Sequence, residues 1–140
     1  MFHIFIKSHF SAGHHLRNYP GNCERPHGHN WKVEVTVRAE SLDSLGMGVD
    51  FRTVKADALD DLGMGIDFRS VKAAVKKVLD TLDHCDLNEH PGFKTINPSS
   101  ENIAVYIFDN LQKELTTDRF SVHSVTVRET DNSGVTYFGK

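Results

Sequence analysis

The heptapeptide Cys-Glu-Arg-Pro-His-Gly-His at residues 23–29 runs directly into the decapeptide Asn-Trp-Lys-Val-Glu-Val-Thr-Val-Arg-Ala at residues 30–39. Apolar residues alternate with polar ones along the decapeptide, which predicts a strand with one buried and one wet face, as in an antiparallel sheet. His27 and His29 lie two residues apart, so in an extended chain their imidazoles point to the same side. The stretch therefore predicts a sheet with reactive side chains gathered at one strand end.

A metal site is the interpretation that we favour for these histidines. His14 supplies a third imidazole upstream, and the chain has nine histidines in 140 residues. Three neutral imidazoles with one open position are typical of a catalytic zinc site. A pair of histidines in a loop is more often simply solvated, but this clustering favours metal binding. The spacing leaves open whether Cys23 is a fourth ligand, which would favour a structural site, or a nucleophile or base.

The rest of the chain predicts an α+β fold. Alternating apolar residues predict further strands at residues 2–12, about 120–130 and 135–138. A turn-rich loop at residues 17–26 is expected to carry Cys23 over the site. Two apolar stripes at helical spacing predict two helices: Phe68, Val71, Val75, Val78 and Leu82 in one, and Ile103, Ile107, Leu111 and Leu115 in the other. The order strand, strand, helix, helix, strand, strand predicts an α+β fold with an antiparallel sheet.

An internal repeat interrupts this plan. The dodecapeptide at residues 45–56 recurs at residues 62–73 with only Val/Ile and Thr/Ser replacements, which indicates a tandem duplication within residues 45–73. One pair of copies is too few for a repeat architecture. We expect the second copy to hold the helix, capped by Asp67, because its apolar stripe continues to Leu82. The first copy would be an extra helical segment or a surface excursion hinged at Gly63 and Gly65, and such insertions cost little closure entropy.

Two further polar groups are candidates for chemistry. Asp83 and His84 end the first predicted helix; alone they would be ordinary polar residues there, but together with Cys23 they form a possible proton-transfer unit. Glu129 shares a strand face with Val125 and Val127, and a carboxylate on an apolar face is costly without a partner. A pairing with Arg128 or a lysine is the simpler alternative for Glu129.

Several of these motifs together resemble one family. The motifs, in order, are Phe10–His14, Cys23 with His27–Trp31, Leu82–His84, Pro98–Asn102 and Val127–Thr130. Their order and spacing resemble the 6-pyruvoyl-tetrahydropterin synthase and 6-carboxy-tetrahydropterin synthase family over nearly the whole chain. The three residues between Cys23 and His27 resemble the bacterial 6-carboxy branch, because the animal 6-pyruvoyl enzymes place more residues there.

The resemblance implies a fold and an assembly. The fold would be the T-fold, in which helices cover one face of a four-stranded antiparallel sheet and subunits join edge to edge into a barrel. Similar enzymes are hexamers built from two trimers, with active sites between subunits. Such assembly also covers sheet edges that would otherwise invite aggregation.

The resemblance also implies roles for the site residues. Zinc would bind to His14, His27 and His29, while Cys23 acts as general base and Asp83 with His84 as the second proton-transfer unit. Glu129 would anchor the pterin through its two-donor edge, with Ser99 and Ser100 near the same pocket. No motif identifies the residues that steer the triphosphate, for which Arg25 and Lys7 are candidates.

The reaction implied is the conversion of 7,8-dihydroneopterin triphosphate to 6-carboxy-5,6,7,8-tetrahydropterin, with loss of triphosphate and acetaldehyde, as a step toward queuosine and related deazapurines. The nearest alternative is 6-pyruvoyl-tetrahydropterin synthesis, which uses the same residues. Two others remain: a non-catalytic zinc-binding T-fold module with Cys23 as fourth ligand, and an enzyme inactivated by its duplication. No nicotinamide is expected, because the sequence has no glycine-rich dinucleotide fingerprint.

Composition agrees with one domain over residues 1–140. A formal net charge of −3 gives no reason to expect nucleic acid or anionic membranes as partners. No apolar run approaches the roughly 18 residues that a membrane span needs, and the first residues do not resemble a signal peptide. Cys23 and Cys85 are therefore expected to be free thiols in a cytoplasmic protein, with Cys85 a packing residue.

Overall fold

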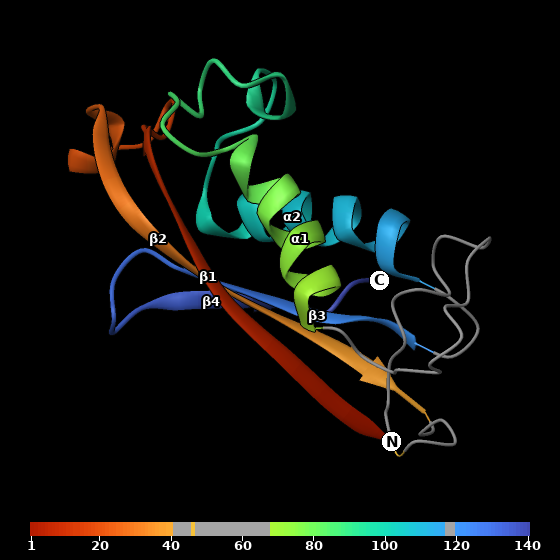
Figure 1. Cartoon of the computed structure of the whole chain (residues 1–140). Helices are drawn as coiled ribbons and strands as arrows, with labels where there is room; N and C mark the ends of the chain where they lie inside the picture. Colours follow the sequence, from red (N-terminus) through yellow and green to blue (C-terminus); the bar gives the residue numbers. More distant parts are fainter. Residues whose placement is uncertain (41–45, 47–67, 117–119) are drawn as a thin grey trace.

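The computed structural model describes residues 1–40, 46, 68–116 and 120–140, and within them a four-stranded sheet covered by two helices (Figure 1). The strands are β1 (Phe2–His14), β2 (His27–Ala39), β3 (Phe120–Arg128) and β4 (Gly134–Tyr137), antiparallel and in the order β1-β2-β3-β4. The helices are α1 (Phe68–Asp80) and α2 (Ser100–Leu115), with short 3-10 turns η1 (Asn22–Glu24) and η3 (Pro91–Phe93). The predicted α+β order of elements is confirmed.

Both helices cover the same face of the sheet, as Figure 1 shows. Along β2 the odd-numbered residues from Trp31 to Ala39 are buried and the even-numbered ones are wetter, as the alternation predicted. The second predicted stripe is buried on α2, and Ser99 caps that helix by accepting a hydrogen bond from the Asn102 backbone N–H at 3.3 Å. One continuous core thus lies between this face and the helices.

Helix α1 (Phe68–Asp80) begins in the second copy of the repeat, as predicted. It begins at Phe68, and Val71, Val75, Val78 and Leu82 are all buried. The first copy, apart from Gly46, lies outside the described residues, as do Asp67 and the two glycines expected to act as a hinge. No helix in the described part of the chain is long and apolar enough to cross a membrane.

Strands β1 and β2 are longer than predicted at the end that carries the histidines. Their pairing runs from Phe2 opposite Ala39 to His14 opposite His27, so both histidines belong to the sheet. The sequence predicted strand limits at residues 12 and 30 because apolar alternation stops there. Backbone pairing continues without it, since Gly13 and Gly28 face each other and the ladder needs only main-chain groups.

Candidate active site

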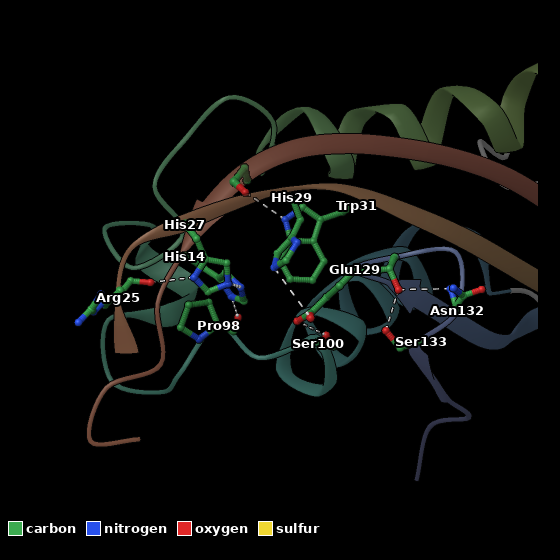
Figure 2. Close-up of polar contacts among 12 residues, drawn as sticks. His14, Arg25, His27, His29, Trp31, Pro98, Ser100, Glu129, Asn132 and Ser133 are labelled. Carbon is green, nitrogen blue, oxygen red and sulfur yellow. Dashed lines mark hydrogen bonds and ion pairs between the residues drawn. The ribbon is translucent and has the colours of Figure 1, made fainter. Parts of the chain in front are cut away.

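The sheet brings the three predicted histidines together at the end of β1 and β2. One ring nitrogen from each of His14, His27 and His29 lies within 4.8 Å of the others (Figure 2). His27 and His29 are on the helix-covered face of β2, and His14 is opposite His27 on β1. The Trp31 ring packs edge-on against His14 and His29, with ring centroids 4.9 and 5.0 Å apart, and closes the cluster toward the core.

Backbone carbonyls orient two of these rings. The Nδ1 of His14 lies 2.7 Å from the Pro98 carbonyl oxygen, and the Nδ1 of His27 lies 2.7 Å from that of Arg25. A carbonyl only accepts, so each Nδ1 carries the proton and each Nε2 presents a lone pair. The two Nε2 atoms are 3.1 Å apart. Imidazoles whose other ring nitrogen donates to a fixed acceptor in this way are typical of metal ligands.

The electrostatics favour the ligand form of the imidazoles. Burial is the main reason why the pKa values of His14 and His29 lie below the usual range. It outweighs the raising effects of the Pro98 carbonyl on His14 and of Glu129 on both histidines. Neutral imidazole is the form that binds a metal. The Nε2 of His29 is buried and has no hydrogen bond in the described part of the chain. A metal ion shared by the three rings would satisfy this nitrogen and separate the facing lone pairs, so the residues fit such an ion.

Glu129 borders the cluster, as Figure 2 shows. Its Oε2 lies 3.9 Å from the His29 Nε2, and its Oε1 accepts a hydrogen bond from the Ser100 hydroxyl at 2.9 Å. Among the described residues, the nearest ionisable partner of the carboxylate is thus His29, and no ion pair joins Glu129 to Arg128 or a lysine. Glu129 follows the last residue of β3, one position beyond the observed strand. Ser100 is thus a direct partner of the carboxylate, whereas Ser99 caps α2.

The Asp83 and His84 side chains are in contact with each other at the edge of β1 that faces away from β2. The Asp83 Oδ2 lies 2.8 Å from the His84 Nδ1, and its Oδ1 accepts a hydrogen bond from the Ser11 backbone N–H at 2.8 Å. These two contacts, with Ser11 first, hold the pKa of Asp83 below its usual range, so it is a carboxylate at neutral pH. The His84 side chain is 82% exposed, in a left-handed backbone conformation (φ 54°).

His84 and the histidine cluster border the same shallow groove, which has a volume of about 420 Å³. His29 and His84 both line it, as do Gly13 and Gly28, which have no side chains to separate them. Cys85, beside His84, packs against the core and donates from its thiol to the Leu82 carbonyl at 3.2 Å. The packing role predicted for Cys85 agrees with this placement.

Cys23 does not meet the other predicted residues within this chain. It lies exposed in η1, where its carbonyl accepts a hydrogen bond from the Leu16 backbone N–H at 2.7 Å. Among the described residues, its thiol has no hydrogen bond to the histidine cluster or to the Asp83–His84 pair. Lys7 lies on the outer face of β1, 3.6 Å from Glu34, so it faces away from the histidines. Arg25 is exposed and contacts His27 through its backbone carbonyl.

Solved structures with the same architecture define this class as the T-fold. The structure of the 6-pyruvoyl tetrahydropterin synthase of Caenorhabditis elegans matches with a TM-score of 0.75 and 27% identity, over 99% of this chain and 96% of that one. The enzyme of the same name from Plasmodium vivax matches with a TM-score of 0.66 at 19% identity, which shows the fold alone. The predicted T-fold is confirmed.

The family follows from the sequence matches. The family model described as 6-pyruvoyl tetrahydropterin synthase matches residues 3–58 and 53–140. The human 6-pyruvoyl tetrahydrobiopterin synthase is 36% identical over 86% of this chain and 72% of its own length. The 6-carboxy-5,6,7,8-tetrahydropterin synthase of Synechocystis is 32% identical over 99% and 94%, and that of Bacillus subtilis is 32% identical over 92% and 80%. The chain belongs to the 6-pyruvoyl tetrahydropterin synthase family and is an enzyme of its lyase type.

Two parts of the site were not predicted from the sequence. The Pro98 and Arg25 carbonyls that orient the rings gave no signal, because every residue has a carbonyl. The loop that positions Pro98 has no periodicity and is held by contacts from residues more than 70 positions away.

Proposed function

We propose that this protein catalyses the zinc-dependent conversion of 7,8-dihydroneopterin triphosphate to 6-carboxy-5,6,7,8-tetrahydropterin, with loss of triphosphate and acetaldehyde, as a cytoplasmic step toward queuosine. The observation that carries the proposal is the three-histidine cluster beside the Glu129 carboxylate in a chain of this family. The short spacing between Cys23 and His27 and the match to nearly the full length of the Synechocystis 6-carboxy enzyme favour this product.

Glu129 and Ser100 make the binding half of the proposed site. The carboxylate accepts from the N2 amine and N3 proton of the pterin, and the Ser100 hydroxyl keeps one of its oxygens in place. Ser99 supports the same pocket by capping the helix that carries Ser100. Arg25, exposed beside the cluster, is the better candidate to steer the triphosphate, since Lys7 faces the other side of the sheet.

His14, His27 and His29 are the residues that would hold the zinc ion. When bound, zinc would lower the pKa of the substrate's side-chain hydroxyls and polarise the neighbouring carbon. Cys23 takes a proton from the substrate as general base. His84 performs the second proton transfer, with Asp83 holding its ring by the contact at Nδ1.

We also propose that the working site is shared between subunits of a hexamer of two trimers. Cys23 is exposed on a loop, and the Asp83–His84 pair lies on the open edge of β1, so neither finds the other within one chain. Edge-to-edge joining of sheets would bring Cys23 of one subunit to the Asp83–His84 pair of a neighbour.

A second candidate is 6-pyruvoyl-tetrahydropterin synthesis. It is favoured by the 36% identity to the human enzyme and by the 27% identity to the Caenorhabditis elegans enzyme of known structure. All residues assigned above would keep the same roles, and the difference would lie in the fate of the substrate side chain.

The products decide between the two. Purified protein is incubated with 7,8-dihydroneopterin triphosphate, with and without a chelator, and the products are identified by mass. Acetaldehyde with 6-carboxy-tetrahydropterin, lost on chelation and restored by zinc, supports the first proposal. A 6-pyruvoyl product supports the second, and a zinc-loaded protein without either product contradicts both.

A further inference from the structure

Arg17 connects two loops that meet at the histidine cluster. Its guanidinium donates three hydrogen bonds to backbone carbonyls: Nη1 to Phe93 at 2.9 Å and Ile96 at 3.0 Å, and Nη2 to Asn88 at 2.9 Å. These three carbonyls belong to the loop between α1 and α2, in which the 3-10 turn η3 is the longest regular element described. A single side chain thus supplies partners that this irregular loop lacks in its own backbone.

Two asparagines complete the connection on either side. The Asn97 side chain accepts from the Arg17 backbone N–H at 2.8 Å and donates to the Arg17 carbonyl at 3.2 Å. The Asn88 side chain does the same to the backbone of His15, at 2.9 and 3.0 Å, and is itself buried. The segment that follows His14 is therefore joined to the loop at both His15 and Arg17.

The loop held in this way contains the carbonyl that orients His14. Pro98 follows Asn97 directly, is buried, and accepts from the His14 Nδ1 at 2.7 Å. The Asn97 carbonyl also accepts from the Asn102 side chain at 2.8 Å, which connects the loop to the first turn of α2. The position of Pro98 relative to His14 thus depends on the contacts that Arg17 makes.

We infer that Arg17 is a positioning residue, which acts through the Pro98 carbonyl to hold the His14 imidazole in the orientation that presents Nε2 to a metal ion. This inference rests on the proposed metal site. The guanidinium is suited to the role because its donors are spread over a rigid plane and reach carbonyls of three separate residues. A lysine ammonium at this position keeps the charge but concentrates its donors at one point, so it cannot span them.

The test measures metal binding without substrate. Zinc affinity is determined by competition with a chromophoric chelator, and the visible absorption of the cobalt-substituted protein reports ligand geometry. Loss of an outer-shell partner typically weakens metal affinity by about 10- to 100-fold, and we expect Arg17→Lys to weaken zinc binding by about tenfold and to shift the cobalt bands. Arg38→Lys is the matched control: Arg38 is exposed on the outer face of β2 and pairs with Glu40, so both readouts should stay as in the wild type.

A lower melting temperature alone would not support the inference. If Arg17→Lys keeps the zinc affinity and cobalt spectrum of the wild type, the arginine only stabilises the fold and the inference is overturned. Should that variant fail to fold, Asn97→Ala, which removes both side-chain hydrogen bonds to the Arg17 backbone, is measured in the same way. Unchanged metal binding in Asn97→Ala would then overturn the inference.

The outcome is distinguishable from failure of the proposed function. A wild-type protein that binds zinc but gives no pterin product contradicts the proposed reaction, while the affinity comparison still decides the role of Arg17. An active wild type with unchanged binding in the variant contradicts the role of Arg17 alone. A wild type that binds neither zinc nor cobalt overturns both.

Discussion

His14 and His27 are both oriented by backbone carbonyls, which affects how mutations near them will act. Their Nδ1 atoms contact main-chain oxygens of Pro98 and Arg25, so side-chain replacement at either of those two residues leaves the acceptor in place. Metal ligands oriented by carboxylates lose their partner when that residue is changed. Here the orientation depends on the path of the backbone, and the sensitive residues are those that hold the loops.

A substitution at Cys23 distinguishes a catalytic zinc site from a structural one. In its proposed role as general base, Cys23 is needed for turnover and not for metal binding, so Cys23→Ala should abolish product formation, with zinc content unchanged. The same measurements on Cys85→Ala provide the control, since that thiol packs against the core. Loss of zinc from Cys23→Ala would instead identify a fourth ligand and contradict the catalytic role.

Glu129 offers a second test at the scale of one side chain. Glu129→Gln replaces one acceptor oxygen by a donor, which opposes the two-donor edge of a pterin. A hydrogen bond to a charged group contributes roughly 1.5–3 kcal/mol, so kcat/KM should fall by roughly 10- to 100-fold.

Ser100→Ala is the milder comparison for Glu129→Gln, because it removes the hydroxyl that holds the carboxylate but leaves both acceptor oxygens. Zinc content should be unchanged in both variants. Equal kcat/KM in Glu129→Gln and the wild type would show that the carboxylate does not contact the pterin.

Among the elements, those with apolar periodicity were predicted well from the sequence and those without it were not. Helix α2 and strand β2 have stripes that only one secondary structure can bury, and Ser99 precedes α2 as a cap. The ends of β1 and β2 were missed because glycine pairs opposite glycine there without an apolar side chain. The same holds for the site. The clustering of the three histidines was predicted from their spacing, whereas the role of Arg17 was not, because it acts through loop carbonyls that no sequence pattern marks.

We expect the 3-10 turn η3 to make the stability of the fold depend on pH. His90 caps it by accepting from the Gly92 backbone N–H at 3.0 Å, and its ring packs on Tyr106 and Phe93. Burial lowers the pKa of His90, so the unfolded chain takes up a proton more readily than the folded one. The stabilisation from neutral His90 is therefore present above the unfolded pKa of about 6.5 and is lost as the pH falls below it.

His90→Asn should reduce this dependence. Asparagine can also cap a helical turn but does not titrate, so the free energy of unfolding of the variant should fall less between pH 7.5 and 5.5 than that of the wild type. Urea unfolding of both proteins in chelator, which removes any contribution from bound metal, measures the difference. An equal decline in the two proteins would assign the pH dependence to other histidines, such as His123, whose pKa burial also lowers.

For the whole molecule, the shared site proposed above predicts complementation. Cys23→Ala and His84→Ala subunits should each be inactive alone. The two variants are mixed, unfolded and refolded together. Some sites should then combine an intact Cys23 with an intact Asp83–His84 pair, and activity should return to a sizeable fraction of the wild-type value. Activity that stays absent in the mixture, with assembly shown by gel filtration, would place all three residues of a working site in one chain.

The edge of β1 that faces away from β2 is free of backbone partners over only part of its length. From Ser11 to Gly13 it is already occupied: Ser11 contacts Asp83 and His84, the Gly13 N–H donates to the Cys85 carbonyl at 3.1 Å, and Leu87 donates back to Gly13 at 2.9 Å. A neighbouring strand that adds to this edge must therefore stop where that segment begins. In the proposed hexamer, this segment would set the offset between adjoining sheets and leave His84 at their boundary.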